Sequence, residues 1–236
     1  MAVPFSIILL ATMPGAIGAP HAGVIRHPPA DTPAAAAPVA PAAVEQGGIE
    51  GRLVMRSEPV RRRAERYPGG VAPARAVQAI PAVVFLRGAM RREPAARTRA
   101  SLIQQDTTFV PAVVIVGTGS TIDFPNGDPF FHNVFSYSPA KRFDLGRFPQ
   151  GESRSVRFDE PGIVRVYCEV HETMRSAVIV TANPFHAIVN RDGSFSIPDV
   201  PAGRWELEVW HADHRGQVVP VTVEAGRITR LKLTLE

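Results

Sequence analysis

The chain has a single cysteine, Cys168, in 236 residues, so no disulfide can form within it and a disulfide-stabilised scaffold is excluded. Lysine is almost as scarce: of the 26 lysine and arginine residues, only Lys141 and Lys232 are lysines. The seven histidines limit how many metal centres the chain can hold alone. With 45% hydrophobic and 20% charged residues, the composition fits a packed globular protein. It excludes collagen, a purely disordered tail and a polytopic membrane protein.

Long hydrophobic runs are also lacking. The main one, within residues 4–19, is short and broken by proline and glycine, which is typical of an export signal and not of a spanning helix. We therefore expect a signal peptide at 1–18, a periplasmic or otherwise exported protein, and no stable membrane insertion beyond this segment. No lysine or arginine precedes the run, so cleavage and retention as a tether both stay open.

Two stretches of biased composition follow. Residues 19–48 are rich in proline and alanine, which favours an extended linker. Twelve arginines and three glutamates between Arg52 and Arg99 give a local charge of +9, against +4 for the whole chain. This stretch is either a solvated surface segment or a surface that attracts an acidic partner protein. It has few aromatics and no nucleic-acid motif, so we expect no nucleic-acid partner.

The remaining sequence favours β-structure throughout. Short apolar or alternating runs are separated by turn residues, without a helical period. The expected strands are 49–55, 82–86, 109–116, 121–124, 131–137, 153–158, 163–168 and 177–181, and then 186–190, 194–197, 205–210, 218–223 and 228–235. They form two groups, and we predict an all-β protein of two β-sandwiches.

The segment 168–174 carries the chemistry. Cys168, His171 and Met174 place a thiolate, an imidazole and a thioether within seven residues, directly after an expected strand. This soft donor set suits copper in both of its oxidation states. A site with two histidines needs one more imidazole, and His132, at the start of another expected strand, is the candidate. A C-x-x-H pair alone is weak, since both residue types also occur in inert cores, but a lone thiol in an exported protein needs burial or ligation.

Residues 105–182 resemble the cupredoxins, the blue copper domains of the plastocyanin and amicyanin type. The resemblance rests on Phe131-His132-Asn133-Val134, on Pro161-Gly162 leading to Tyr167-Cys168, and on the amicyanin-like C-x2-H-x2-M spacing. It implies a Greek-key β-sandwich over 101–182 with one mononuclear type 1 copper. His132, Cys168 and His171 are then equatorial ligands and Met174 is axial.

The same resemblance implies that Asn133 ties the two ligand-bearing segments together by hydrogen bonds, and one residue departs from the family pattern. Val170 stands where related loops often have proline, and its N–H is expected to donate to the Cys168 sulfur and raise the reduction potential.

The C-terminal segment 184–236 resembles the carboxypeptidase-regulatory-like (transthyretin-like) Ig-type domains through Asp192-Gly193-Ser194-Phe195 and the run 197–207. Such domains begin with two further strands, and segments within 49–92 suit those places. The cupredoxin is therefore expected to be inserted into the Ig-type domain. Pairing of 82–86 with cupredoxin strands alone would refute this topology.

The function expected from these features is periplasmic one-electron transfer, with a redox partner, possibly acidic, docking beside His171 at Phe130 and Phe131. The alternative is a copper-handling protein outside any redox chain. An enzyme is not expected, because the sequence has no His-x-His pairs for a trinuclear centre. The segment 211–214, HADH, could hold a surface metal, although a polar turn after a strand is the simpler interpretation.

Overall fold

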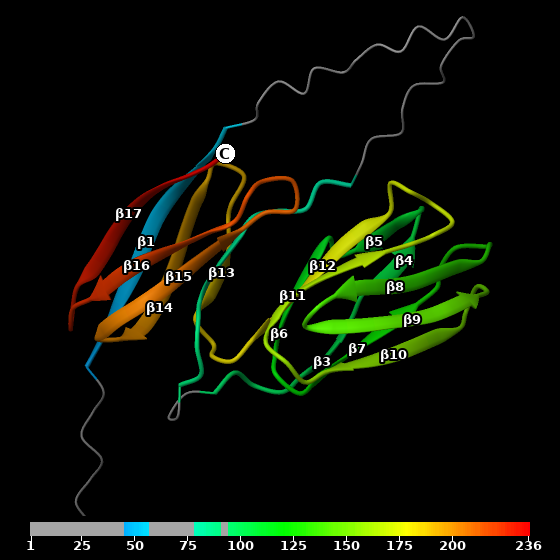
Figure 1. Cartoon of the computed structure of the whole chain (residues 1–236), viewed down its shortest axis with the longest axis horizontal. Coiled ribbons are helices and arrows are strands. Elements are labelled where there is room, and N and C mark those ends of the chain that lie inside the picture. The colour runs from blue at the N-terminus through cyan, green and yellow to red at the C-terminus, as the bar shows by residue number, and fades with distance from the viewer. Residues whose placement is uncertain (1–44, 57–77, 91–93) are drawn as a thin grey trace, which may run out of the picture. The chain divides into compact units, whose positions relative to one another are not determined.

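The structure is a computed structural model that describes residues 45–56, 78–90 and 94–236 (Figure 1). The expected signal peptide 1–18, the linker up to residue 44 and the arginine-rich residues 57–77 and 91–93 lie outside the described residues. Every helix or strand assigned within these ranges is a β-strand, which confirms the all-β prediction. A search of the same ranges finds no helix that could cross a membrane.

One group of strands forms what we call the central sandwich. It has a five-stranded sheet in the order β6-β12-β11-β8-β9, a three-stranded sheet β10-β7-β3, and the hairpin β4-β5. The bounds are β3 Arg99–Ser101, β4 Ile103–Gln105, β5 Thr108–Val110, β6 Val113–Gly117, β7 Ser120–Pro125, β8 His132–Ser138, β9 Lys141–Phe148, β10 Ser153–Phe158, β11 Gly162–Tyr167 and β12 Arg175–Thr181.

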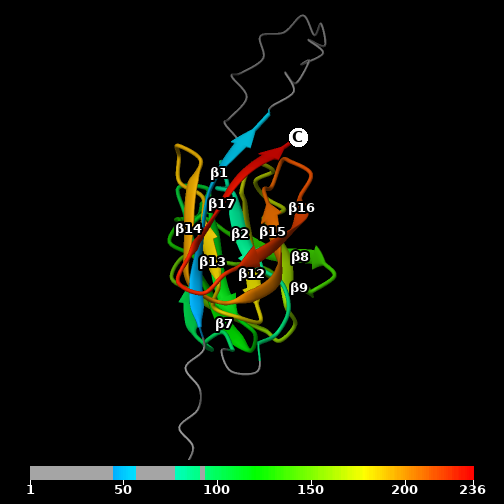
Figure 2. The same cartoon turned by 90° about the vertical axis from the view of Figure 1, so that its left-hand side faces the viewer.

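The other strands form what we call the terminal sandwich, because they come from both ends of the described chain. Its sheets run β14-β1-β17 and β13-β2-β15-β16, and Figure 2 shows β14, β1 and β17 side by side. The bounds are β1 Gln46–Met55, β2 Val83–Leu86, β13 His186–Ile188, β14 Ser194–Pro201, β15 Gly203–Trp210, β16 Gln217–Val223 and β17 Ile228–Leu235.

β1 and β2 come before the central sandwich in the chain but pair with strands that come after it. β1 lies antiparallel to β14 and parallel to β17, while β2 lies between β13 and β15. This is the pairing that insertion of one sandwich into the other requires. β1 begins at Gln46, three residues before the expected strand and inside the expected linker.

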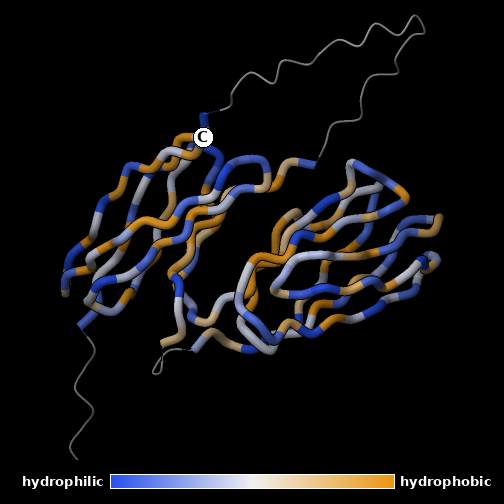
Figure 3. The backbone as a smooth tube through the Cα atoms, viewed as in Figure 1, coloured by the Kyte–Doolittle hydropathy of each residue, from blue (hydrophilic) through white to orange (hydrophobic). Residues whose placement is uncertain are grey.

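Each sandwich has its own apolar core, and alternation along the strands builds it. In β7 the buried side chains of Ser120, Ile122 and Phe124 alternate with half-buried ones, as expected for a strand with one face on a core. Figure 3 shows the same interchange of hydrophobic and hydrophilic residues along the strands of both sandwiches. Phe124 and Phe158 are among the largest buried side chains of the central core, as Leu207 is of the terminal core.

The strands β12 and β2 are buried on both faces. In β12, Val178 and Val180 face the central core, whereas Ala177 and Ile179 belong to a third cluster. In β2, Val83 and Phe85 belong to that third cluster. The third cluster therefore joins apolar residues of both sandwiches, which explains why these strands read as continuous hydrophobic runs.

The Asp192-Gly193 turn sets the register of β14 against β1. Gly193 has φ +85°, and a Cβ there would collide with the carbonyl oxygen of Leu53. Its own carbonyl accepts a 2.8 Å hydrogen bond from the Leu53 N–H. Glycine is needed at this position for both its backbone conformation and its close approach to β1.

Three strands were not predicted from the sequence, and two others were predicted as a single strand. β3, β4 and β9 were not expected, and the expected strand 109–116 is divided into β5 and β6 around Pro111. Proline has no N–H to donate to a neighbouring strand, so it favours a break at that point.

Candidate metal centre

The segment from Cys168 to Met174 connects β11 to β12 in a short, self-closed loop. The Cys168 N–H donates to the Met174 carbonyl oxygen at 3.2 Å, and the Met174 N–H donates to the His171 carbonyl oxygen at 3.0 Å. Cys168 is 4% exposed and Met174 is fully buried, and both belong to the central apolar core. The loop therefore holds the thiol at the edge of the core, away from water.

His132 reaches this loop through strand pairing. It is the first residue of β8, which lies beside β11 through the Phe135–Tyr167 pair. Because neighbouring strands lie about 4.8 Å apart, this pairing brings His132 to Cys168 across 36 residues of sequence. The imidazole of His132 is fully buried.

Three donor atoms converge at this point. The Cys168 Sγ lies 3.6 Å from the His132 Nδ1 and 4.0 Å from the His171 Nδ1, and the two Nδ1 atoms are 3.2 Å apart. All three atoms lie within 4.8 Å of one another. Within residues 45–56, 78–90 and 94–236, this is the one group of three or more His, Cys, Asp or Glu side chains that could hold a metal ion.

An aromatic rim lies beside the cluster. The Phe130 ring centroid is 5.1 Å from that of His132 and 5.6 Å from that of His171. Phe130 is 41% exposed and Phe131 is 56% exposed, while His171 is half-buried. Among the three donors, His171 is thus the one nearest to solvent.

Asn133 ties β8 to the loop that follows β11. Its Oδ1 accepts a 2.6 Å hydrogen bond from the Glu169 N–H, which follows Cys168 directly. Val170 is 43% exposed, and the hydrogen bonds of the described chain include none from its N–H to the Cys168 sulfur. The tuning role of Val170 therefore stays a prediction.

Sequence reasoning missed Asp128, which lies behind His132. Its Oδ2 is 2.7 Å from the His132 Nε2, and the carboxylate is also bonded by the backbone N–H groups of Asp106 at 2.7 Å and Thr107 at 2.9 Å. Burial raises the pKa of Asp128, but the hydrogen bonds from Thr107, His132 and Asp106 outweigh it, so the pKa lies below its ordinary value. The four-residue spacing to His132 was the only signal in the sequence, and it is not specific.

Asn126 fixes the turn that carries Asp128. Its Nδ2 donates to the carbonyl oxygens of Phe130 at 2.9 Å and Phe148 at 3.0 Å, and its Oδ1 accepts from the Asp128 N–H at 3.0 Å. A buried amide with all these partners holds the chain between β7 and β8 in one shape.

The HADH segment after β15 lies apart from this cluster. The rings of His211 and His214 are 4.8 Å apart, but the Asp213 carboxylate is engaged by both terminal nitrogens of Arg175, at 2.5 and 2.6 Å. This pairing lowers the pKa of Asp213. The carboxylate therefore serves an ion pair between β12 and the terminal sandwich.

Several arginines of the basic stretch are also paired. Arg87 contacts Glu206 and Glu208 at 3.5 Å each, and Arg99 contacts Asp123 at 2.6 Å. Part of the local positive charge is thus balanced within the fold.

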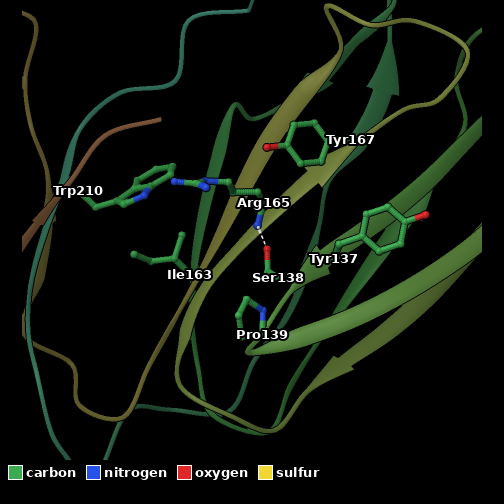
Figure 4. A pocket seen from close by; sticks show the side chains of 7 residues that line it. All are labelled: Tyr137, Ser138, Pro139, Ile163, Arg165, Tyr167 and Trp210. Carbon is green, nitrogen blue, oxygen red and sulfur yellow. Dashed lines mark hydrogen bonds between the residues drawn. The ribbon is translucent and has the colours of Figure 1, made fainter. Parts of the chain in front are cut away.

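A separate pocket lies beside β8 and β11, with Trp210 of β15 on its other side (Figure 4). Its lining residues are Tyr137, Ser138, Pro139, Ile163, Arg165, Tyr167 and Trp210. Within it, the Arg165 N–H donates to the Ser138 Oγ at 2.8 Å. None of the three donor residues lines this pocket, so it is not part of the metal cluster.

Fold and cluster together define an all-β protein of two sandwiches with a His–Cys–His group at one end of the central sandwich, in which His132 and Cys168 are buried and His171 is half-buried. The family model that matches is the β-sandwich domain of ER membrane protein complex subunit 7, over residues 169–235. This differs from the carboxypeptidase-regulatory-like family expected for the C-terminal segment. A comparison with curated proteins finds no match.

Solved structures similar to the chain include cupredoxins. A purple cupredoxin from Nitrosopumilus maritimus is 22% identical with a TM-score of 0.32, over 35% of this chain and 99% of that one. Amicyanin from Paracoccus versutus is 21% identical with a TM-score of 0.33, over 41% of this chain and 96% of that one. A copper-containing nitrite reductase from Thermus scotoductus is 19% identical with a TM-score of 0.33, over 54% of this chain and 28% of that one.

Proposed function

We propose that this protein binds one copper ion as a type 1 centre and carries single electrons between partner proteins. The observation that carries the proposal is the convergence of the Cys168 Sγ and the Nδ1 atoms of His132 and His171 at one place, where two of the three side chains are buried and His171 is half-buried. A thiolate with two imidazoles is the donor set that type 1 copper uses. The donors come from strand β8 and from the loop that follows β11. When bound, copper supplies a Cu(II)/Cu(I) couple that takes up and releases one electron.

The residues present fit such a group. His132, Cys168 and His171 would hold it, and Met174, buried in the same apolar core as Cys168, is proposed as the axial thioether. The core around Cys168 keeps water from the thiol. The backbone hydrogen bonds of the loop and the Asn133 bond to Glu169 hold the donors in a fixed frame, which favours electron exchange with little rearrangement.

Partner contact is proposed at the aromatic rim. Phe130 and Phe131 are exposed apolar side chains next to the half-buried His171, so a partner docked there excludes water close to a ligand. One electron passes from a reduced partner to the protein and then to an oxidised partner, and no covalent bond forms or breaks. The arginine-rich stretch supports an acidic partner.

The remaining parts of the proposal rest on the sequence. The apolar run within 4–19 supports export to the periplasm or beyond, where a reduced free thiol needs the protection of a ligand. The lack of His-x-His pairs in the sequence supports a carrier and not an oxidase.

Copper addition tests the proposal. Metal-free protein is titrated with Cu(II), and one equivalent is expected to produce an intense thiolate-to-copper absorption in the visible range, which ascorbate bleaches and an oxidant restores. The absence of such a band at one equivalent would refute the type 1 assignment. Because the sequence leaves a copper-handling role open, the loaded protein is also mixed with a chelator: slow loss of copper supports a carrier, and rapid transfer supports handling.

A further inference from the structure

The Asp128 carboxylate contacts the His132 ring but is not one of the proposed copper ligands. We propose that Asp128 is a positioning residue of the metal centre: it fixes the orientation of the His132 ring and lowers the reduction potential through its negative charge. This inference rests on the proposed type 1 copper function and concerns one residue of this chain.

The first step is the assignment of the two ring nitrogens. The His132 Nε2 lies 2.7 Å from the Asp128 Oδ2, whereas the Nδ1 faces the Cys168 Sγ at 3.6 Å. An ionised carboxylate only accepts hydrogen bonds, so the Nε2 must carry the proton. The Nδ1, on the other side of the ring, points at the place where the three donors converge.

The second step is the fixing of Asp128 itself. Asp106 and Thr107 form the turn of the β4-β5 hairpin, with φ 54° and 57°, and both of their N–H groups point at the carboxylate. Two successive non-glycine residues with positive φ are uncommon and cost conformational energy. The hairpin turn thus aims two donors at Asp128, while the Asn126 Oδ1 holds its backbone N–H.

The third step is the charge. Asp128 is 5% exposed, and burying a carboxylate costs free energy unless hydrogen bonds compensate it. Two backbone N–H groups and one imidazole N–H provide that compensation. A carboxylate that accepts the N–H of a ligating imidazole makes that imidazole a stronger electron donor. A stronger donor favours Cu(II) over Cu(I), so the carboxylate is expected to lower the reduction potential.

The test compares Asp128→Asn and Asp128→Ala with the wild type by redox titration of the copper-loaded protein. Both variants are expected to shift the preference toward Cu(I) at least tenfold, which raises the potential by about 59 mV for a one-electron couple. The control is Glu172→Gln, which removes an equal charge from an exposed side chain next to His171. Its shift is expected to be smaller, because solvent screens an exposed charge.

A second measurement does not depend on copper. Nitrogen-15 NMR of the metal-free wild-type protein at pH 8 is expected to show His132 protonated at Nε2, and Asp128→Ala is expected to populate the other tautomer. A wild-type His132 protonated at Nδ1, or a shift in potential no larger than that of Glu172→Gln, would overturn the proposal. A wild type without the visible band refutes the copper function itself, so the two failures are distinguishable.

Discussion

The two sandwiches bury apolar cores of the same size but differ in what else they bury. Each core cluster contains 16 buried residues, mostly valine, isoleucine, leucine and phenylalanine. The described strands of the terminal sandwich bury no polar or charged side chain, whereas the central sandwich buries ten and the segment after it buries Asn183. Asn126, Asp128, His132 and Asn133 are four of the ten and lie within eight residues.

This difference places the polar groups of the candidate site in the central sandwich. Buried polar groups cost free energy unless they are hydrogen-bonded. In the central sandwich Asn126 and Asp128 bond one another and nearby backbone groups. The buried side-chain amide of Gln104, in β4, is the exception and has no hydrogen-bond partner. The polar group therefore forms a hydrogen-bonded frame for the donors at one end of the sandwich, while the apolar core has as many buried residues as that of the terminal sandwich.

The largest expected effect is that of Cys168→Ser on copper binding by the central sandwich. The variant removes the soft sulfur donor, so the visible band at one equivalent of copper should be lost completely. Because the hydroxyl is close in size to the thiol, the β-sheet circular dichroism spectrum should persist. The control is His214→Ala, whose histidine lies outside the cluster and which should keep the full band. A band in Cys168→Ser above a tenth of the wild-type intensity would contradict the assignment.

Next in size is Leu207→Ala in the terminal core. Leu207 is fully buried, so truncation is expected to lower the free energy of unfolding by about 3 kcal/mol. Both tryptophans lie in β15, and Trp205 packs against the terminal core, so tryptophan fluorescence during urea unfolding reports on the unfolding of β15. Val218→Ala, at a 43% exposed position of β16, is the control and should cost less than about 0.5 kcal/mol. The copper band should be unchanged in Leu207→Ala, and its loss would show that the two cores are not separate.

Asn133→Ala is expected to have an intermediate effect on the central sandwich. It removes the Asn133 bond to the Glu169 N–H, which should cost about 1 to 2 kcal/mol and loosen the ligand loop. Copper should then pass to a chelator faster than from the wild type, as measured by the decay of the visible band. Asn133→Asp keeps an acceptor oxygen and should largely restore the slow rate. Equal rates in wild type and Asn133→Ala would argue against this tie.

The smallest expected effect is that of Asp123→Asn, at the polar face of β7. Hydrogen bonds from Ser155 and Arg99 lower the pKa of the Asp123 carboxyl. Its stabilising contribution is therefore present above the unfolded pKa of about 3.9 and is lost as the pH falls through the lower folded value. At pH 7 the variant should be less stable by about 1 kcal/mol, as measured by urea unfolding followed by circular dichroism. The difference should shrink toward pH 3, and a difference that grows instead would contradict the sign.

Strands with one wet face and one core face could be predicted from the sequence. β7 and β15 alternate clearly, and both were expected near their observed bounds. β9 could not be predicted, because Lys141–Phe148 carries charges and a glycine with only its last residue buried. It is an edge strand that exists through its pairing with β8, and such pairing depends on tertiary contacts and not on local pattern.

The candidate site was predictable where the donors carry distinctive chemistry. Cys168, His171 and Met174 stand close together in the sequence, and the need for a second imidazole pointed to His132. Asp128 was not predictable, because its contact with His132 depends on the shape of the turn that Asn126 fixes. Two of its hydrogen-bond donors come from residues 106 and 107, more than 20 positions upstream.

The parallel pairing of β1 with β17 has a consequence for biosynthesis. Ile49 lies opposite Thr229, so β1 leaves the ribosome long before this partner exists. The central sandwich is contiguous from β3 to β12 and can close while the C-terminal strands are still being made. β1 therefore stays unpaired until its partner strands have been made. Contacts between residues so far apart in the sequence form slowly. A nascent chain stalled before β14 should carry a protease-resistant central sandwich and a protease-sensitive β1.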